Sequence, residues 1–147
     1  MKKHLVNPFA PLSYSFFICA LFTLFVACSK DEKNEPSPAN DIVGEYTGTF
    51  TLASNETTNV KVVIEKVDNK TVIVRPQVAG ATAFRATVTT TGTQGAVFDW
   101  TTSETSGHAL TGSLAGLYQS TSKSLQYLGQ VTVSGQTQYE NFEGNKK

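Results

Sequence analysis

The sequence predicts an all-β domain, and three observations support that fold class. From Ile42 to Lys147 the chain is rich in threonine and valine, which suit a pleated, half-buried surface and are mediocre helix formers. Apolar residues recur at every second position in successive runs, which is the period of a strand. The segments between the runs are short and carry turn residues. None has room for a crossover helix, so antiparallel neighbours are expected.

The first four runs cover residues 46–52, 60–65, 71–75 and 84–89. Threonine and charged residues occupy most of the intervening positions, as expected for strands with one solvated face. The side chains expected on the buried face are Tyr46, Phe50, Val60, Val62, Ile64, Val72, Val74, Phe84, Ala86 and Val88. Gly48 and Leu52 share the face of Tyr46 and Phe50.

The last four runs cover residues 96–100, 110–118, 125–133 and 136–142. The larger side chains expected on their buried faces are Phe98, Trp100, Leu110, Leu114, Tyr118, Leu125, Tyr127, Val131 and Val133. The last run is irregular, because Tyr139 and Phe142 fall on opposite faces unless a bulge realigns them. Ser134-Gly135 is expected to form a two-residue hairpin loop.

Eight sequential antiparallel strands leave two edges that a soluble domain must protect. Closure into a barrel removes both edges. The sequence therefore favours a single antiparallel up-and-down eight-stranded barrel, with a two-sheet β-sandwich as the alternative.

The first 27 residues are predicted to be a bacterial lipoprotein signal peptide. Lys2 and Lys3 give a basic start, and a nearly continuous apolar run of about 13 residues ends at Ala27. That run is shorter than the roughly 20 residues a membrane-spanning helix needs. Because Cys28 follows a small residue, we expect cleavage before it and lipid attachment to its sulfur. An uncleaved N-terminal anchor is the alternative.

Residues 28–41 are predicted to be the lipidated cysteine and a disordered tether, because this segment is charged, contains prolines and has little to bury. Cys28 would be the one cysteine of the mature chain, which leaves no disulfide or thiolate nucleophile. Ser29 resembles the outer-membrane sorting residue of lipoproteins, and the run from Lys30 to Lys33 resembles a surface-export signal. We therefore expect a lipid-anchored outer-membrane protein exposed at the cell surface. A plain solvated spacer is the alternative.

The predicted barrel domain, residues 42–147, has balanced charge and little catalytic potential. It carries eight basic and eight acidic residues and no basic stripe, so we expect no nucleic-acid binding. His108 is its one histidine and is expected in an exposed turn. The carboxylates available for acid–base work are Asp99, Glu104, Glu140 and Glu143. No cluster has metal-ligand spacing, so we expect no enzyme activity, metal or cofactor.

The start of the predicted domain carries the pattern Gly44-x-Tyr46-x-Gly48. Behind a lipidation signal, this pattern resembles the small calycin-like (lipocalin-like) domains of Gram-negative lipoproteins. The resemblance implies a barrel that binds a small apolar ligand. By strand parity, the aromatic residues that would line such an interior site are Tyr46, Phe50, Phe84, Phe98, Trp100, Tyr118 and Tyr127.

Two classes of function remain open at this point. The first is a surface lipoprotein that holds a small apolar ligand inside its barrel, where inward-facing glycines would leave space. The second is a non-catalytic structural or interaction module that binds protein or glycan. In that class, side chains fill the barrel and large aromatic rings occupy the space above the glycines.

Overall fold

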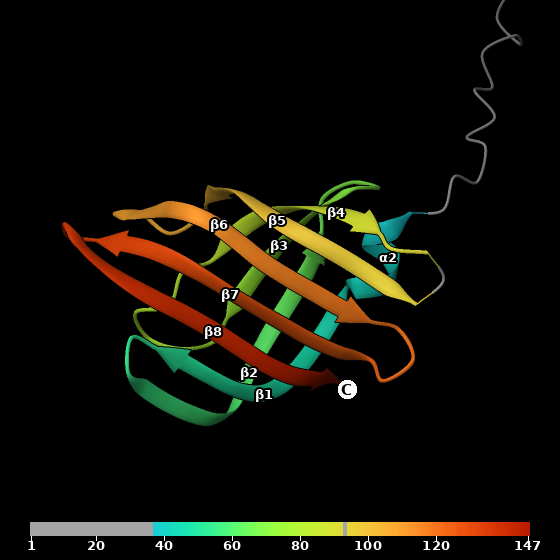
Figure 1. Cartoon of the computed structure of the whole chain (residues 1–147), viewed down its shortest axis with the longest axis horizontal. Helices are drawn as coiled ribbons and strands as arrows, with labels where there is room; N and C mark the ends of the chain where they lie inside the picture. The colour runs from blue at the N-terminus through green and yellow to red at the C-terminus, as the bar shows by residue number, and fades with distance from the viewer. Residues whose placement is uncertain (1–36, 93) are drawn as a thin grey trace, which may run out of the picture. The chain divides into compact units, whose positions relative to one another are not determined.

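The computed structural model describes residues 37–147, residue 93 excepted, and arranges them as eight strands and a short helix. These elements are α2 (Pro38–Ile42), β1 (Gly44–Leu52), β2 (Asn55–Lys66), β3 (Thr71–Pro76), β4 (Phe84–Thr90), β5 (Gly95–Ser103), β6 (His108–Gln119), β7 (Ser124–Val133) and β8 (Gln136–Lys146). The antiparallel strands follow one another around a closed ring, and β8 pairs with β1 (Figure 1). The predicted up-and-down barrel is confirmed, and the sandwich alternative is wrong.

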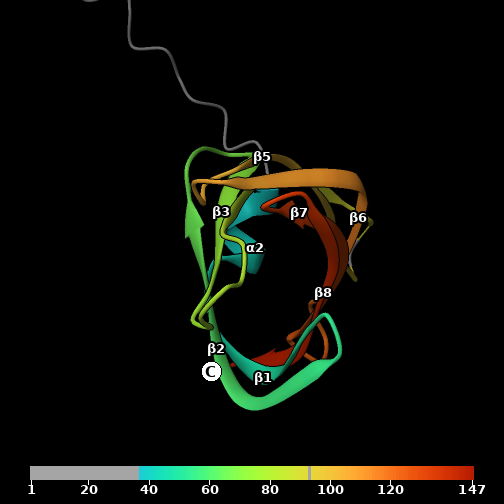
Figure 2. The ribbon, with the colours of Figure 1, turned by 90° about the vertical axis from the view of Figure 1, so that its left-hand side faces the viewer.

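The two ends of the barrel differ. One end, here called the α2 end, holds α2, the β2–β3, β4–β5 and β6–β7 connections, and the C-terminal residue. The other, here called the distal end, holds the β1–β2, β3–β4, β5–β6 and β7–β8 connections. Figure 2 looks along the barrel from the distal end, and α2 lies within the outline of the ring of strands.

The folded domain begins before Ile42, where the sequence predicted its start. Residues 38–41, which the sequence assigned to the disordered tether, lie in α2. Pro38 occupies the first turn of the helix, where a missing N–H costs nothing. Pro38, Ala39 and Ile42 are buried, and the Tyr46 hydroxyl donates a 2.7 Å hydrogen bond to the Ile42 carbonyl oxygen. These few side chains bury enough apolar surface to order the segment against the α2 end. The predicted signal peptide and Cys28 lie outside the described residues.

The last strand is regular, and the bulge considered for it is not needed. Glu140, Phe142 and Gly144 face inward on β8 and are buried. Tyr139 faces outward and is 58% exposed. Tyr139 and Phe142 therefore lie on opposite faces, as their spacing indicates, since β8 keeps one register against β7 from Gln136 to Asn145.

Aromatic rings pack against one another in the barrel interior. The ring of Tyr127 has its centroid 5.4 Å from that of Phe84, 5.8 Å from Phe142, 6.3 Å from Phe98 and 6.4 Å from Phe50. Three of these four contacts are edge-on, the arrangement that aromatic quadrupoles favour. The centre of the barrel is therefore a packed aromatic core.

The inward glycines of β6 and β7 do not leave empty space. A Cβ at Gly116 would lie 2.4 Å from Cε2 of Phe98, and a Cβ at Gly129 would lie 2.4 Å from Cη2 of Trp100. Each glycine thus lets an aromatic ring from β5 lie directly on the backbone of another strand, β6 at Gly116 and β7 at Gly129. This is the second of the two roles considered for these glycines, and it removes the expected room for a ligand.

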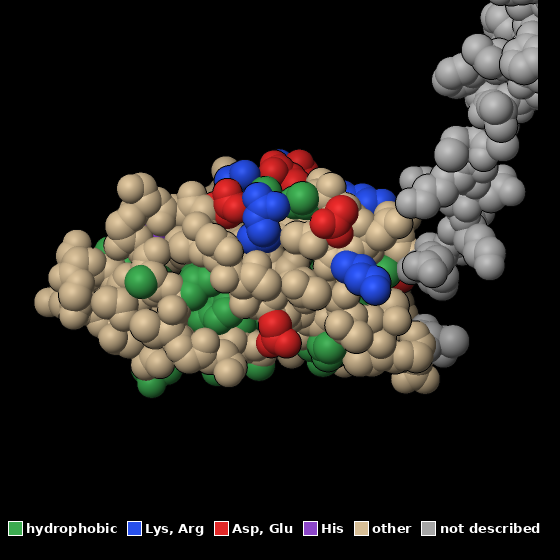
Figure 3. Space-filling model, turned by 90° about the horizontal axis from the view of Figure 1, so that it is seen from above, with side chains coloured by type: hydrophobic (Ala, Val, Ile, Leu, Met, Phe, Trp, Pro, Cys, Tyr) green, Lys and Arg blue, Asp and Glu red, His purple; other side chains and the backbone are tan. Residues whose placement is uncertain are grey.

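The outer surface carries both signs of charge side by side. Lys61 pairs with Glu45, Arg75 with Glu65 and Arg85 with Glu104. On the face shown in Figure 3, basic and acidic side chains alternate among polar ones. Of the residues from 37 onward that the structure describes, none forms a helix with the length and apolar character of a membrane span.

Candidate functional site

The structure places the seven aromatic residues proposed for an interior site close together. Six of them are buried: Tyr46, Phe50, Phe84, Phe98, Tyr118 and Tyr127. Trp100 is partly buried, with its ring centroid 5.6 Å from that of Phe84 and its indole N–H donated to the Gly112 carbonyl oxygen at 3.3 Å. Phe50, Phe84 and Phe98 contact the ring of Tyr127, and Tyr46 and Tyr118 form a separate edge-on pair, so side chains occupy the barrel interior at these positions.

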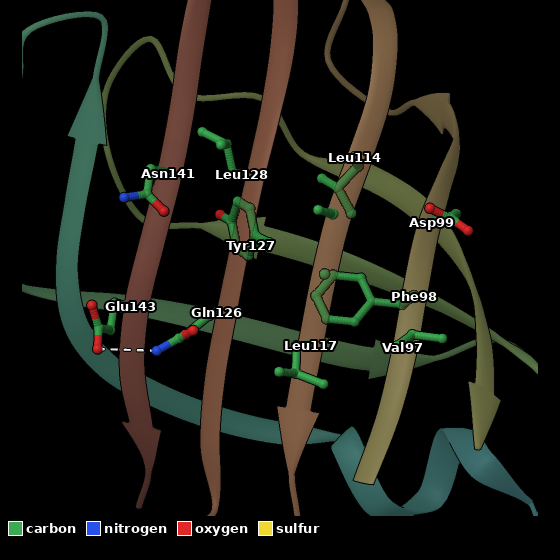
Figure 4. Close-up of a pocket in the computed structure, with 12 residues that line it drawn as sticks. Val97, Phe98, Asp99, Leu114, Leu117, Gln126, Tyr127, Leu128, Asn141 and Glu143 are labelled. Carbon is green, nitrogen blue, oxygen red and sulfur yellow. Dashed lines mark hydrogen bonds between the residues drawn. The ribbon is translucent and has the colours of Figure 1, made fainter. Parts of the chain in front are cut away.

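A depression of about 720 Å³ lies instead on the outer wall of the barrel, across β5, β6, β7 and β8. We call it the outer groove (Figure 4). Val97, Leu117 and Leu128 contribute its large exposed apolar side chains, with 38%, 37% and 50% of their surface accessible. They come from β5, β6 and β7, so the groove presents an apolar strip across three strands.

Polar side chains flank this apolar strip. Asp99 lies on the β5 side, and Asn141 and Glu143 lie on β8 (Figure 4). Gln126 Nε2 donates to Glu143 Oε1 at 3.0 Å, which fixes that carboxylate at the groove margin. The lining residues, all within the described part of the chain, include two carboxylates and no lysine or arginine. The groove therefore combines exposed apolar surface with negative charge.

A buried polar cluster that the sequence analysis missed lies at the distal end. Thr82 N–H donates to both carboxylate oxygens of Glu140, at 3.0 and 3.1 Å. The Thr82 hydroxyl donates to Glu140 Oε1 at 2.6 Å and lies 2.8 Å from Nδ1 of His108. Thr82 is fully buried and Glu140 is 1% exposed. Glu140 thus stands inside the barrel on β8, and His108 begins β6 instead of lying in an exposed turn.

Burial is the main cause of the raised pKa values of Glu140 and the neighbouring Tyr127. Burial raises the pKa of Glu140 above 4.5, while the hydrogen bonds from Thr82 and the neighbouring His108 act in the opposite direction. The pKa of the Tyr127 phenol is also raised well above its usual value, first by burial and then by the charge of Glu140. The Tyr127 hydroxyl is buried and has no hydrogen-bond partner.

The cluster lacks the geometry of a hydrolytic triad. In a triad, the base lies between the acid and the nucleophile. Here the hydroxyl of Thr82 lies between Glu140 and His108, and it is inaccessible to a substrate. In the described residues, no group of three or more His, Cys, Asp or Glu side chains could hold a metal ion. The cluster holds two parts of the barrel together instead.

Replacing Tyr127 with phenylalanine tests whether the unpaired hydroxyl destabilises the folded protein. A buried hydroxyl without a partner costs about 1–3 kcal/mol, so Tyr127→Phe should raise the free energy of unfolding by about 1 kcal/mol in urea titration. Tyr46→Phe is the matched control and should lower it, because the Tyr46 hydroxyl has a partner. A less stable Tyr127→Phe protein would show that a bound water satisfies this hydroxyl.

These features define the molecule as a closed eight-stranded barrel with a filled interior and an open groove on its outer wall. No protein-family model matches the chain, and no curated protein matches it. Among solved structures it is similar to a Bacteroides fragilis protein described as a "putative outer membrane protein", with a TM-score of 0.57 and 15% sequence identity. The match covers 78% of this chain and 54% of the other, so the chain spans about half of that protein. At this identity the likeness shows a shared fold, and membership of the calycin-like group stays a prediction.

Proposed function

We propose that this protein is a lipid-anchored, non-catalytic interaction module of the outer membrane, and that it binds a partner protein through the outer groove. The observation that carries the proposal is the contrast between the two faces of the barrel. The inner face is filled by contacting aromatic rings, whereas the outer face exposes Val97, Leu117 and Leu128 in a groove of about 720 Å³. Exposed apolar clusters of this kind mark interaction sites.

The shape and charge of the groove favour a protein segment over a small apolar molecule. Small-molecule sites bury most of the ligand surface, and a depression on the outside of a barrel wall leaves one side of its occupant in water. The carboxylates of Asp99 and Glu143 favour a partner that presents a basic side chain next to an apolar one. Outer-membrane location and lipid anchoring come from the sequence, and the description of the similar Bacteroides protein as a "putative outer membrane protein" agrees with the location.

A small apolar ligand inside the barrel, the function implied by the calycin-like resemblance, is the second candidate. One observation favours it: the buried Tyr127 hydroxyl lacks a partner and could bond a polar group of a ligand. The ligand would have to displace rings that now contact the ring of Tyr127, such as those of Phe84 and Phe98. The outer groove requires no such rearrangement and is therefore the better supported site.

Photo-crosslinking in the native envelope tests the outer groove. A photoreactive phenylalanine at Leu128 should give one discrete crosslinked species, because this side chain is half exposed and is the most exposed of the apolar strip. The matched control is the same amino acid at Ile73, which lies on the outer face of β3, opposite β7 in the ring. This control should give no discrete species.

A charge reversal then tests the expected chemistry of the partner. Asp99→Lys should weaken the crosslink from position 128 at least tenfold, because it places a cation where the partner's basic side chain is expected. An equally strong adduct from position 73, or an unchanged adduct in the Asp99→Lys protein, would overturn the proposal.

A further inference from the structure

The β3–β4 connection, residues 77–83, folds over the distal end of the barrel; we call it the lid. Val78 and Ala81 pack against the hydrophobic core, and Gly80 adopts a φ of +81°, which permits the turn between them. A Cβ at Gly80 would lie 3.4 Å from Cδ2 of Leu52, at the end of β1. The lid thus reaches from the β3–β4 wall toward the wall formed by β1 and β8.

The lid is held to the far wall by one residue. Thr82 makes three hydrogen bonds to Glu140 on β8, and β8 lies opposite β4 in the eight-stranded ring. The same Thr82 hydroxyl reaches His108 at the start of β6. On its own side, Ala83 bonds to Thr105 and Glu104 in the β5–β6 connection. The attachment across the barrel mouth therefore depends on Glu140, Thr82 and His108, which we call the latch.

We propose that residues 77–83 are a movable lid over the distal end and that the latch releases when Glu140 loses its proton. The Thr82 hydroxyl lies between Glu140 and His108, and it can donate a hydrogen bond to either one while accepting from the other. With Glu140 protonated, the carboxyl group can donate to Thr82, and Thr82 can donate to His108 Nδ1. With Glu140 ionised, the cluster keeps a charge buried in the barrel mouth, and moving the lid away returns that charge to water.

The groups that face Glu140 are few, and they fix the sign of the effect. They are Thr82 from the lid, His108 from β6, Tyr127 from β7 and Gln138 from its own strand. Burial raises the pKa of Glu140 in the closed state, and the hydrogen bonds from Thr82 and Gln138 and the effect of His108 offset it only in part. In the open state the carboxyl would be in water, with its ordinary pKa near 4.5.

Opening therefore releases a proton at any pH between 4.5 and the raised value. Below this window both states are protonated and the lid is held most firmly. Within this pH range the equilibrium constant for lid opening rises by up to about tenfold per pH unit. Above the raised pKa of Glu140 it no longer changes. The lid opens more readily as the pH rises, and this dependence belongs to Glu140.

Two substitutions distinguish release of the latch from a loss of overall stability. In Glu140→Gln the amide cannot ionise, and it can still accept from the Thr82 N–H and donate to the Thr82 hydroxyl, as a protonated glutamic acid does. In Thr82→Val the shape is kept and the hydroxyl is lost. The first variant should stay latched at every pH. The second should be latched more weakly at every pH, because it keeps the backbone N–H bonds to Glu140 and loses the hydroxyl contacts with Glu140 and His108.

Hydrogen exchange of the Thr82 amide, followed by NMR and expressed as a protection factor, measures opening directly. In the wild-type protein this factor should fall by up to about tenfold per pH unit between pH 4.5 and the raised pKa of Glu140, and then stay constant. It should be high and independent of pH in Glu140→Gln, and at least tenfold lower at acid pH in Thr82→Val. The amide of Val62, which lies in β2 between two paired strands, is the internal control for global unfolding and should not follow this pattern.

Three results would overturn the proposal of a movable lid. A wild-type protection factor that does not change with pH would remove the role of Glu140. The same pH slope in Glu140→Gln would assign the effect to a group other than Glu140. Parallel changes at Val62 and Thr82 would mean that the whole barrel unfolds and that no separate lid exists.

Discussion

Gly48→Ala is expected to lower the free energy of unfolding by about 3 kcal/mol, near the upper end of typical overpacking costs. Gly48 on β1 is paired with Gly144 on β8 where the barrel closes. A Cβ at position 48 would lie 2.0 Å from the carbonyl oxygen of Glu143 and 2.4 Å from the Cα of Gly144. Both atoms belong to the backbone, so the methyl group can be accommodated only by moving one strand away from the other.

Urea unfolding followed by circular dichroism measures this loss, and Thr51→Ala on the same strand is the control. Thr51 lies on the outer side of β1 and is partly exposed, so its truncation should cost less than about 1 kcal/mol. If Gly48→Ala and Thr51→Ala unfold at the same urea concentration, β1 and β8 do not approach each other as closely as described.

Cys28→Ala is expected to move the protein from the membrane fraction to the soluble fraction and to abolish palmitate incorporation. The apolar run before Cys28 is about 13 residues, too short to hold the chain across a bilayer, so attachment should depend on the acyl chains. Acyl chains bind at about 0.8 kcal/mol per buried CH₂, and more than one is needed for stable anchoring.

The chain supplies its own control for this experiment. Cys19 lies inside the apolar run and is expected to be removed with the signal peptide, so Cys19→Ala should keep both palmitate and membrane attachment. Both variants are compared by sedimentation of the envelope and by metabolic labelling. A Cys28→Ala protein that sediments with the membrane would contradict lipidation as the means of anchorage.

The barrel could be predicted because strand alternation is a local property of the sequence. Tyr46, Phe50 and Phe84 were expected to face inward from parity alone, and all three are buried. Helix α2 could not be predicted in the same way, because it is only five residues long, begins with a proline and follows a charged segment. The helix is ordered because Ala39 and Ile42 pack against core side chains that are distant in the sequence.

The two candidate sites escaped prediction for different reasons. Glu140 has the parity of Phe142, which pointed inward, yet carboxylates are so seldom buried that an inward position was not expected. Its partner Thr82 lies 58 residues away in a connection without regular structure. The outer groove needs Val97, Leu117 and Leu128 from three strands to meet on one curved wall, and that meeting depends on register and barrel curvature.

The order of strands around the ring also bears on how the chain folds. Every pairing except that of β1 with β8 joins strands that are consecutive in the sequence, so most of the sheet can assemble from hairpins as the chain emerges. The final pairing must wait for β8 (Gln136–Lys146), which follows the other seven strands of the barrel in the sequence. Until then β1 and β7 are free edges that can pair with other chains. The C-terminal strand is therefore the segment that turns an aggregation-prone open sheet into a closed barrel.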